Sequence, residues 1–164
     1  MTAPAEQVVE WVDDHGRVLS LVSRSQVRAR NLLHRSVAVV VRSPAGEVLV
    51  HRRADWKDVW PGYWDLAVGG VVGVGEPWAA AARRELAEEV GVEATELVEL
   101  GAFTYRDSQV AALARVFTTT AAGPFAFADG EVVEAGWVPL DELEAWVGAH
   151  AVCPDSLAGV LPLL

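Results

Sequence analysis

The sequence predicts an α/β fold, in which helices are interleaved with the strands of a mixed sheet. Three observations indicate this class. Of the 164 residues, 52% are hydrophobic, and a chain of this length can bury a substantial core. Short β-branched runs recur between turn signals, as expected for strands. One longer amphipathic segment lies between Pro77 and Gly91, which suit the start and the end of a helix. Because the sequence contains no repeat or linker, residues 1–164 are expected to form one domain.

The first third of the chain contains signals for a strand, a helix and a hairpin. Residues 17–24 (RVLSLVSR) predict a short strand and turn, and residues 25–34 (SQVRARNLLH) predict a short helix. Within residues 36–53, two β-branched runs flank residues 43–46 (SPAG), whose composition is typical of a turn. This segment therefore predicts a β-hairpin.

The rest of the chain continues the alternation of strands and helices. Residues 64–72 (WDLAVGGVV) predict a strand, and Pro77 then opens the helix that Gly91 closes. The remaining segments predict three strands, a helix and a last short helix: strands over 96–106, 109–120 and 131–140, a helix over 141–149, and a final helix after Asp155-Ser156.

Charge is distributed unevenly along the chain. The net charge is -10, yet residues 17–57 contain nine basic residues and two acidic ones, while residues 85–164 contain fourteen acidic and two basic residues. An acidic chain argues against general nucleic-acid binding, since affinity for a duplex depends on neutralising phosphates. A basic first third beside an acidic helix could instead hold an anion on one side and a cation on the other. Ordinary solvated surface is the alternative.

Composition also indicates the compartment. Cys153 is the single cysteine, which excludes an intramolecular disulfide and suits a reducing cytosol. The first 14 residues carry four acidic side chains where a secretory signal would be basic. The longest aliphatic run, residues 37–41, is too short to cross a bilayer. A cytoplasmic protein without a membrane partner is expected.

The helix after Pro77 has a core-facing side. At about 100° per residue, one stripe collects four apolar side chains, which should pack against the sheet: Ala79, Ala82, Leu86 and Val90.

Three carboxylates lie beside this stripe, at Glu85, Glu88 and Glu89. At spacings i, i+3 and i+4 they are neighbours and repel one another. Two of them lie in the last turn, where the helix dipole disfavours anions. Carboxylates gathered where they cost stability indicate a hard divalent cation, which prefers oxygen ligands. The alternative is a polar surface face without a cation.

The segment from Gly70 to Val92 resembles the Nudix box, G-x5-E-x7-R-E-U-x-E-E-x-G-U, where U is aliphatic. Every defined position is filled at the right separation, by Gly70, Glu76, Arg84, Glu85, Leu86, Glu88, Glu89, Gly91 and Val92. The resemblance implies the Nudix fold, in which a mixed sheet lies between helices. It also implies a reaction, the attack of water on a diphosphate linkage assisted by Mg²⁺ or Mn²⁺.

The resemblance further implies roles within the box. The metal ligands would be three carboxylates, one of which could also be the base that activates water: Glu85, Glu88 and Glu89. Arg84 would orient a carboxylate and act in the reaction without binding metal, and Glu76 would be a structural partner of the box. Gly70 and Gly91 would serve backbone geometry. Glu131, six residues before Trp137, lies where some family members place a further metal-binding carboxylate; Asp129 and Glu134 compete with it.

The chain before the box resembles isopentenyl diphosphate isomerase, a Nudix relative, and a bacterial Nudix branch close to it. The shared pieces are residues 33–35 (LHR), 52–54 (RRA) and 61–64 (PGYW), and residues 1–35 would be an isomerase-like strand and helix extension. The resemblance implies that Arg53 and Lys57 bind diphosphate, as guanidinium forks suit phosphate oxygens. Arg52 would point to the opposite face of the strand.

The isomerase machinery itself is missing. The position of its catalytic cysteine holds Gly69, the position of a metal-binding histidine holds Val71, and its acidic pair has no counterpart near residues 107–110. His34 alone matches a metal histidine, and a histidine that enters a strand is usually structural. The complete box and the missing cysteine favour hydrolysis over isomerisation.

Four aromatic residues crowd the segment after the basic strand: Trp56, Trp60, Tyr63 and Trp64. They could stack on a nucleobase, but packing in the core and loops is the favoured role.

Three functions remain to be distinguished. The favoured one is a metal-dependent hydrolase of a nucleoside diphosphate derivative or nucleoside polyphosphate, with a small-molecule diphosphate as partner. The others are an isomerase of an isoprenoid diphosphate and a non-catalytic binding module. No accessory motif selects one diphosphate, and the oligomeric state is open, with a homodimer among the states to test.

Overall fold

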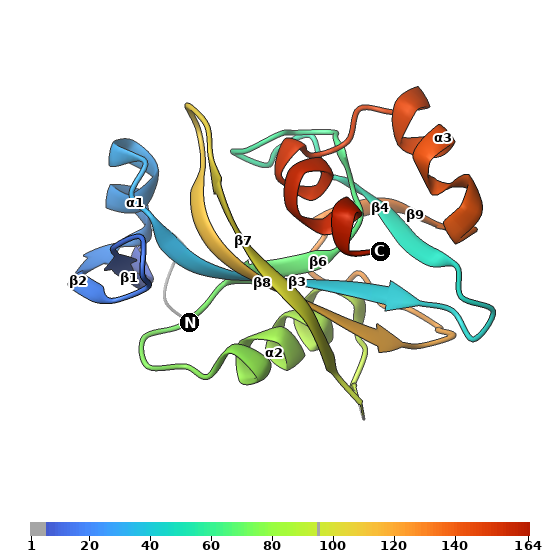
Figure 1. Ribbon diagram of the computed structural model, residues 1–164, viewed down its shortest axis with the longest axis horizontal. Helices are drawn as coiled ribbons and strands as arrows, with labels where there is room; N and C mark the ends of the chain where they lie inside the picture. The colour runs from blue at the N-terminus through green and yellow to red at the C-terminus, as the bar shows by residue number, and fades with distance from the viewer. Residues whose placement is uncertain (1–5, 95) are drawn as a thin grey trace.

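The computed structural model describes residues 6–94 and 96–164. They form one mixed sheet of nine strands, with α2 on one side and α1, α3 and the C-terminal turns on the other in the view of Figure 1. The elements are β1 (Val8–Val12), β2 (Val18–Ser23), α1 (Arg24–Arg30), β3 (His34–Arg42), β4 (Val48–Arg53), β5 (Trp64–Asp65), β6 (Val68–Val71), α2 (Trp78–Val90), β7 (Val98–Arg106), β8 (Ala111–Thr120), β9 (Val132–Val138) and α3 (Leu143–Ala149). The predicted α/β class is confirmed.

Strand β3 is the centre of the sheet. It runs parallel to β8 and antiparallel to β6, and it also contacts β1 and β4 at its two ends. Its apolar run is buried on both faces: Val37, Val39 and Val41 pack toward α2, whereas Val40 packs with the C-terminal segment. Burial on both faces explains why β3 reads as a continuous apolar run without alternation.

The predicted hairpin over residues 36–53 is wrong in its pairing. The turn is present, and the Ser43 hydroxyl accepts hydrogen bonds from the backbone of Ala45 and Glu47. However, β3 and β4 pair only through Arg42 and Val48. Beyond that pair the strands diverge, because β4 pairs with β9 and β5 while β3 pairs with β8 and β6. The divergence separates the sheet into two parts that share this corner (Figure 1).

The predicted strand over residues 64–72 is two strands. β5 pairs with β4, and β6 pairs with β3. Between them the Asp65 carboxylate accepts a hydrogen bond from the Leu66 backbone at 2.8 Å. A short polar side chain that binds the following backbone competes with the ladder, so the chain leaves one part of the sheet and joins the other.

The N-terminal region differs from prediction in two ways. β1, which pairs with β2, was not predicted, because Glu10 occupies a buried position and interrupts its apolar alternation. α1 is shorter than residues 25–34, since Asn31 adopts a left-handed conformation (φ 49°) that ends the helix. Ser23 and Gln26 form a capping box at its start.

The remaining elements follow the predictions closely. Gly91 (φ 69°) ends α2, with the Val92 N–H bonded to the Leu86 carbonyl, while Pro77 lies one position before the first helical residue. Ala82, Leu86 and Val90 are buried as expected. The last predicted helix is a π turn at Ser156–Val160 followed by a 3₁₀ turn at Leu161–Leu163. None of the helices in the described residues has the length and apolar character to cross a membrane.

Candidate active site

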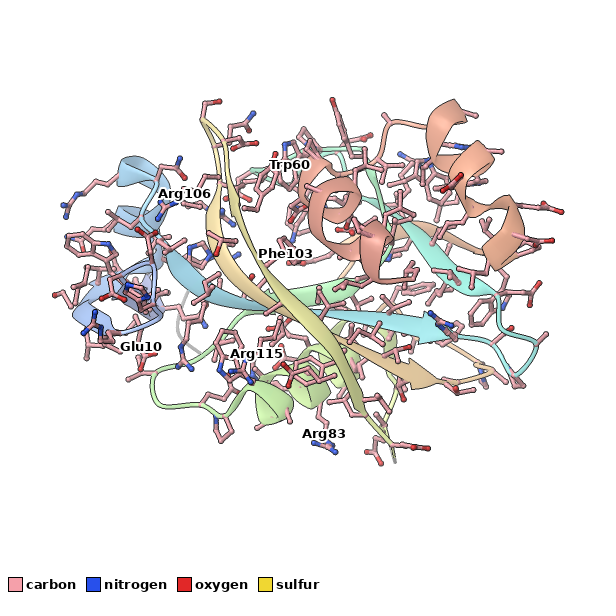
Figure 2. The ribbon with its side chains drawn as sticks, in the orientation of Figure 1. Glu10, Trp60, Arg83, Phe103, Arg106 and Arg115 are labelled. Carbon is pink, nitrogen blue, oxygen red and sulfur yellow. The ribbon has the colours of Figure 1, made fainter. Side chains whose placement is uncertain are left out.

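A cavity of about 1100 Å³ lies between the box segment (residues 70–92), α1, the β4–β5 loop and the C-terminal turns. All six residues proposed from the sequence for catalysis or substrate binding line it: Arg53, Lys57, Arg84, Glu85, Glu88 and Glu89. Glu131 and Asp129 also line it. Figure 2 shows Arg83, the neighbour of Arg84, pointing away from the sheet on the outer side of α2. The helix therefore directs Arg84 to the cavity and Arg83 to the outer surface.

Arg84 organises the loop before α2. Its guanidinium donates to both Glu76 carboxylate oxygens at 3.0 Å and to the Val71 carbonyl at 3.1 Å. Glu76 in turn accepts the Gly73 N–H at 2.7 Å. Bonding to Arg84 lowers the pKa of Glu76 and raises that of Arg84. These bonds thus tie both ends of the loop, at Val71 and Glu76, to the middle of the helix.

Glu85 is held at the inner edge of the cavity. It is 8% exposed, and one carboxylate oxygen accepts from Arg84 at 2.6 Å. Burial raises its pKa despite this arginine. A Cβ on Gly70 would lie 2.6–2.7 Å from the Glu85 carboxylate. Glycine at position 70 therefore provides the space that this carboxylate occupies.

Glu88 and Glu89 lie in different surroundings. Glu88 is exposed, with one oxygen 3.4 Å from Arg84. Glu89 is half-buried; burial raises its pKa well above the usual value, and the charges of Glu85 and Glu131 raise it further. Burial and two neighbouring carboxylates therefore disfavour the ionised form of Glu89, which a bound cation would stabilise.

Glu131 reaches the cavity from the segment before β9. Its carboxylate forms an ion pair with Lys57 and adds to the negative charge around Glu85 and Glu89. Asp129 and Glu134 were the alternatives to Glu131 as a metal ligand. The Asp129 carboxylate accepts a hydrogen bond from the Glu131 backbone N–H at 2.9 Å, and Glu134 forms an ion pair with Arg52 outside the cavity. Over residues 6–94 and 96–164, no three acidic, histidine or cysteine side chains are gathered closely enough to enclose a metal ion. The donor chemistry nevertheless suits a hard divalent cation.

The two proposed diphosphate-binding cations already have partners. Arg53 donates to the Val59 carbonyl at 2.9 and 3.2 Å and lies 3.9 Å from Asp65, while Lys57 pairs with Glu131. To bind a ligand, Lys57 would exchange its Glu131 partner for the ligand, whereas Arg53 is held in orientation by its bonds to the Val59 carbonyl. Arg52 points the other way, toward Glu134, as expected.

The aromatic residues divide between two roles. Trp64 packs edge-on against Trp146, and Trp60 packs against Tyr105 at 6.0 Å between ring centres. Trp60 also lines the cavity at a positive φ of 45° and lies near the β7–β8 hairpin in Figure 2. Trp56 is 65% exposed, so the packing prediction is wrong for it.

The isomerase positions are closed to isomerase chemistry. A Cβ on Gly69 would lie 1.9 Å from the Val37 carbonyl oxygen, so no cysteine side chain fits there. Val71 is buried. Asp107 belongs to the β7–β8 turn, where it accepts the backbone N–H groups of Gln109 and Val110.

One supporting residue was not found by sequence reasoning. Glu10 of β1 is 7% exposed, bonds to Arg35 at 2.5 Å and accepts the Gly75 N–H of the box loop at 2.9 Å. The only sequence signal is an acid within an apolar run, which does not identify its partner 65 residues away.

His34 makes the stability of the protein depend on pH. It is 4% exposed, and burial, with smaller effects of Arg28 and Arg24, lowers its pKa from 6.5 to about 4. Because the unfolded state binds this proton more readily, the free energy of unfolding should fall as pH drops from about 6.5 to about 4, by at most roughly 3 kcal/mol for this group.

We expect His34→Gln to flatten this decline in urea titrations between pH 7 and pH 4.5. Some slope should remain, since burial also lowers the pKa of His51. His15→Gln, at an exposed position, is the control and should keep the full slope. Equal slopes for the His34 variant and the parent would contradict the assignment.

Fold and site together define an α/β protein in which a loop–helix–loop segment presents carboxylates to a cavity that also holds basic side chains. Residues 32–155 match the NUDIX domain family. The chain therefore belongs to the Nudix family and is a Nudix hydrolase, as its curated relatives are.

Two of these relatives are uncharacterized Nudix hydrolases of bacteria. PA4841 of Pseudomonas aeruginosa is 36% identical over 151 residues, which cover 92% of this chain and 89% of that protein. YfcD of Escherichia coli is 37% identical over 151 residues, covering 90% and 83%. Among solved structures, DR0079 of Deinococcus radiodurans has a TM-score of 0.82 at 24% identity and covers 95% of this chain and 98% of that one. The structural likeness supports the fold.

Proposed function

We propose that the protein hydrolyses a diphosphate linkage in a nucleoside diphosphate derivative or nucleoside polyphosphate, with Mg²⁺ or Mn²⁺ as cofactor. The observation that carries the proposal is the gathering of four carboxylates at one wall of a cavity that also contains cations. Burial and the charge of Glu131 disfavour the ionised forms of Glu85 and Glu89 there, while Arg53 and Lys57 lie on the same cavity.

Each group has a task in this reaction. Glu85, Glu88 and Glu89, with Glu131, would hold the metal. The bound metal would neutralise phosphate oxygens and lower the pKa of water. Hydrolysis forms a bond from the water oxygen to phosphorus, breaks the bond to the bridging oxygen and releases one proton from the water. A carboxylate of the box can accept this proton, and Arg84 keeps Glu85 in place for either role.

A relative in structure supports a nucleotide-type ligand. The NUDIX domain of NrtR from Shewanella oneidensis, which is 18% identical with a TM-score of 0.63 and covers 87% of this chain and 96% of that one, is described in complex with ADP ribose. At this identity the likeness shows the fold, and the ligand class comes to the present chain as part of the proposal.

The two other hypotheses are less well supported. An isoprenoid isomerase needs an acid where Gly69 leaves no room for a side chain. A pure binding module has no need of a buried carboxylate such as Glu85 beside two further acids, because such charges oppose anion binding unless a cation is present.

Metal dependence is the direct test. Incubation with Mg²⁺ and a panel of nucleoside diphosphates, triphosphates and diphosphate-linked sugars should give hydrolysis products detectable by chromatography. Excess chelator should abolish turnover while the circular dichroism spectrum persists, because the core does not depend on the metal. Undiminished turnover in chelator would remove the metal from the proposal, and the absence of any product across the panel would overturn the hydrolase.

A further inference from the structure

The N-terminal extension places two arginines on the cavity. Arg24 and Arg28 lie four residues apart on α1, hence on one face of the helix, and both line the cavity together with Arg53 of β4. α1 lies at one end of the molecule, apart from α2 (Figure 1). The chain thus presents a cationic group at a wall that the box segment does not form.

The positive charge of this wall is compensated only in part, since Asp58 lies 3.1 Å from Arg28 and Asp65 lies 3.9 Å from Arg53. Burial lowers the pKa of Arg28, and the charges of Arg24 and Arg53 lower it further, while Asp58 opposes this. Asp58 is 57% exposed, and although its carboxylate lies 3.1 Å from Arg28 Nε, the geometry gives no hydrogen bond. Within residues 6–94 and 96–164, the buried Arg28 Nε has no hydrogen-bond partner, and Arg24 forms no ion pair.

His34 lies beside the same arginines. Its imidazole also lines the cavity, and burial, with smaller effects of Arg28 and Arg24, keeps it neutral at physiological pH. A histidine beside these arginines therefore adds no further repulsion. The three guanidiniums share two carboxylate partners, Asp58 and Asp65, so one positive charge is left over, which a bound anion would neutralise.

We propose that Arg24, Arg28 and Arg53 form a second anion subsite, which binds the terminal phosphoryl group of the substrate. A terminal phosphoryl group carries nearly two negative charges and three acceptor oxygens at neutral pH, which suits several guanidinium forks. A phosphoryl group within a linkage carries one charge and fewer free oxygens. The substrate is therefore a compound that ends in a free phosphate, such as a nucleoside di- or triphosphate, and not a diphosphate capped by sugars at both ends.

This inference rests on the proposed hydrolase function, yet its test needs no turnover. Calorimetric titration with ADP and with ADP-ribose, both in excess chelator, compares the same diphosphate with and without a sugar cap. The parent protein should bind ADP on the order of tenfold more tightly. Arg24→Gln and Arg28→Gln should each lower ADP affinity about tenfold, as expected for the loss of a charge-assisted hydrogen bond, and change ADP-ribose affinity much less.

Arg30→Gln is the matched control. Arg30 is exposed on the same helix, with its guanidinium 5.3 Å from the centre of the Trp11 ring, and does not line the cavity. Its ADP affinity should equal that of the parent. Because Arg24 is only half-buried, its variant keeps the test decisive if Arg28→Gln does not fold.

Several outcomes would overturn the subsite. These are an unchanged ADP affinity in the double variant, an equal loss for ADP and ADP-ribose, and a parent protein that binds neither probe at millimolar concentration. Failure of the hydrolase proposal would instead appear as missing turnover in the Mg²⁺ panel, with the binding differences intact.

Discussion

Glu89→Gln should lower kcat by about 10³-fold while the protein remains folded. The substitution keeps the shape of the side chain but removes the charge of a proposed metal ligand, and a loss of roughly 4 kcal/mol of transition-state stabilisation corresponds to this factor. Because burial, Glu85 and Glu131 all disfavour the Glu89 carboxylate, the variant should also melt at a higher temperature than the parent in the absence of metal.

Steady-state kinetics with saturating Mg²⁺ and thermal melting in chelator measure the two effects. Glu93→Gln is the matched control, because Glu93 is exposed just beyond α2 and does not line the cavity. It should leave both kcat and melting temperature near the parent values. Normal turnover of the Glu89 variant would mean that this carboxylate neither holds the metal nor accepts the proton.

Gly69→Ala should destabilise the protein by more than about 3 kcal/mol or prevent folding. A Cβ at this position would lie 1.9 Å from the Val37 carbonyl oxygen. This oxygen belongs to the β3 backbone, which pairs with β6 at Ala38 and Gly69, so it cannot move aside as a flexible side chain could. Gly69→Cys should fail for the same reason, and with it any attempt to install the isomerase cysteine.

Urea unfolding of the soluble variants checks this expectation. Gly136→Ala is the control, since Gly136 lies in β9 and a Cβ there would meet nothing within 4 Å. Its free energy of unfolding should stay within about 0.5 kcal/mol of the parent. A Gly69 variant with the parent midpoint would show that β6 can shift away from β3.

Local sequence patterns were sufficient to predict the elements whose geometry depends only on residues that are close together in the chain. α2 begins after Pro77 and ends before Gly91 because helix ends follow from local backbone chemistry. The period of 3.6 residues then places Leu86 in the core and Glu85 and Glu89 beside it on the cavity. The interleaved α/β class followed from the same periodicities.

Pairing across the sheet was decided by tertiary structure. The run from Val37 to Val41 identifies a buried strand but not its neighbours, so the divergence of β3 and β4 could not be read from it. The division of residues 64–72 depends on the Asp65 carboxylate, which accepts a hydrogen bond from the Leu66 backbone N–H. A strand pattern gives only the faces of a strand, whereas pairing partners compete over the whole chain.

The residues that line the cavity also fall into two groups, those predictable from the sequence and those placed there only by the tertiary structure. By itself the sequence determined that one helix carries Arg84, Glu85, Glu88 and Glu89, because their spacing along a helix is local. Only the tertiary structure decided that Lys57 meets Glu131, 74 residues away, and that α1 brings Arg24 and Arg28 to the same cavity. Such contacts depend on which surfaces the folded sheet brings together, and the spacing of residues along the chain does not encode the distance between those surfaces.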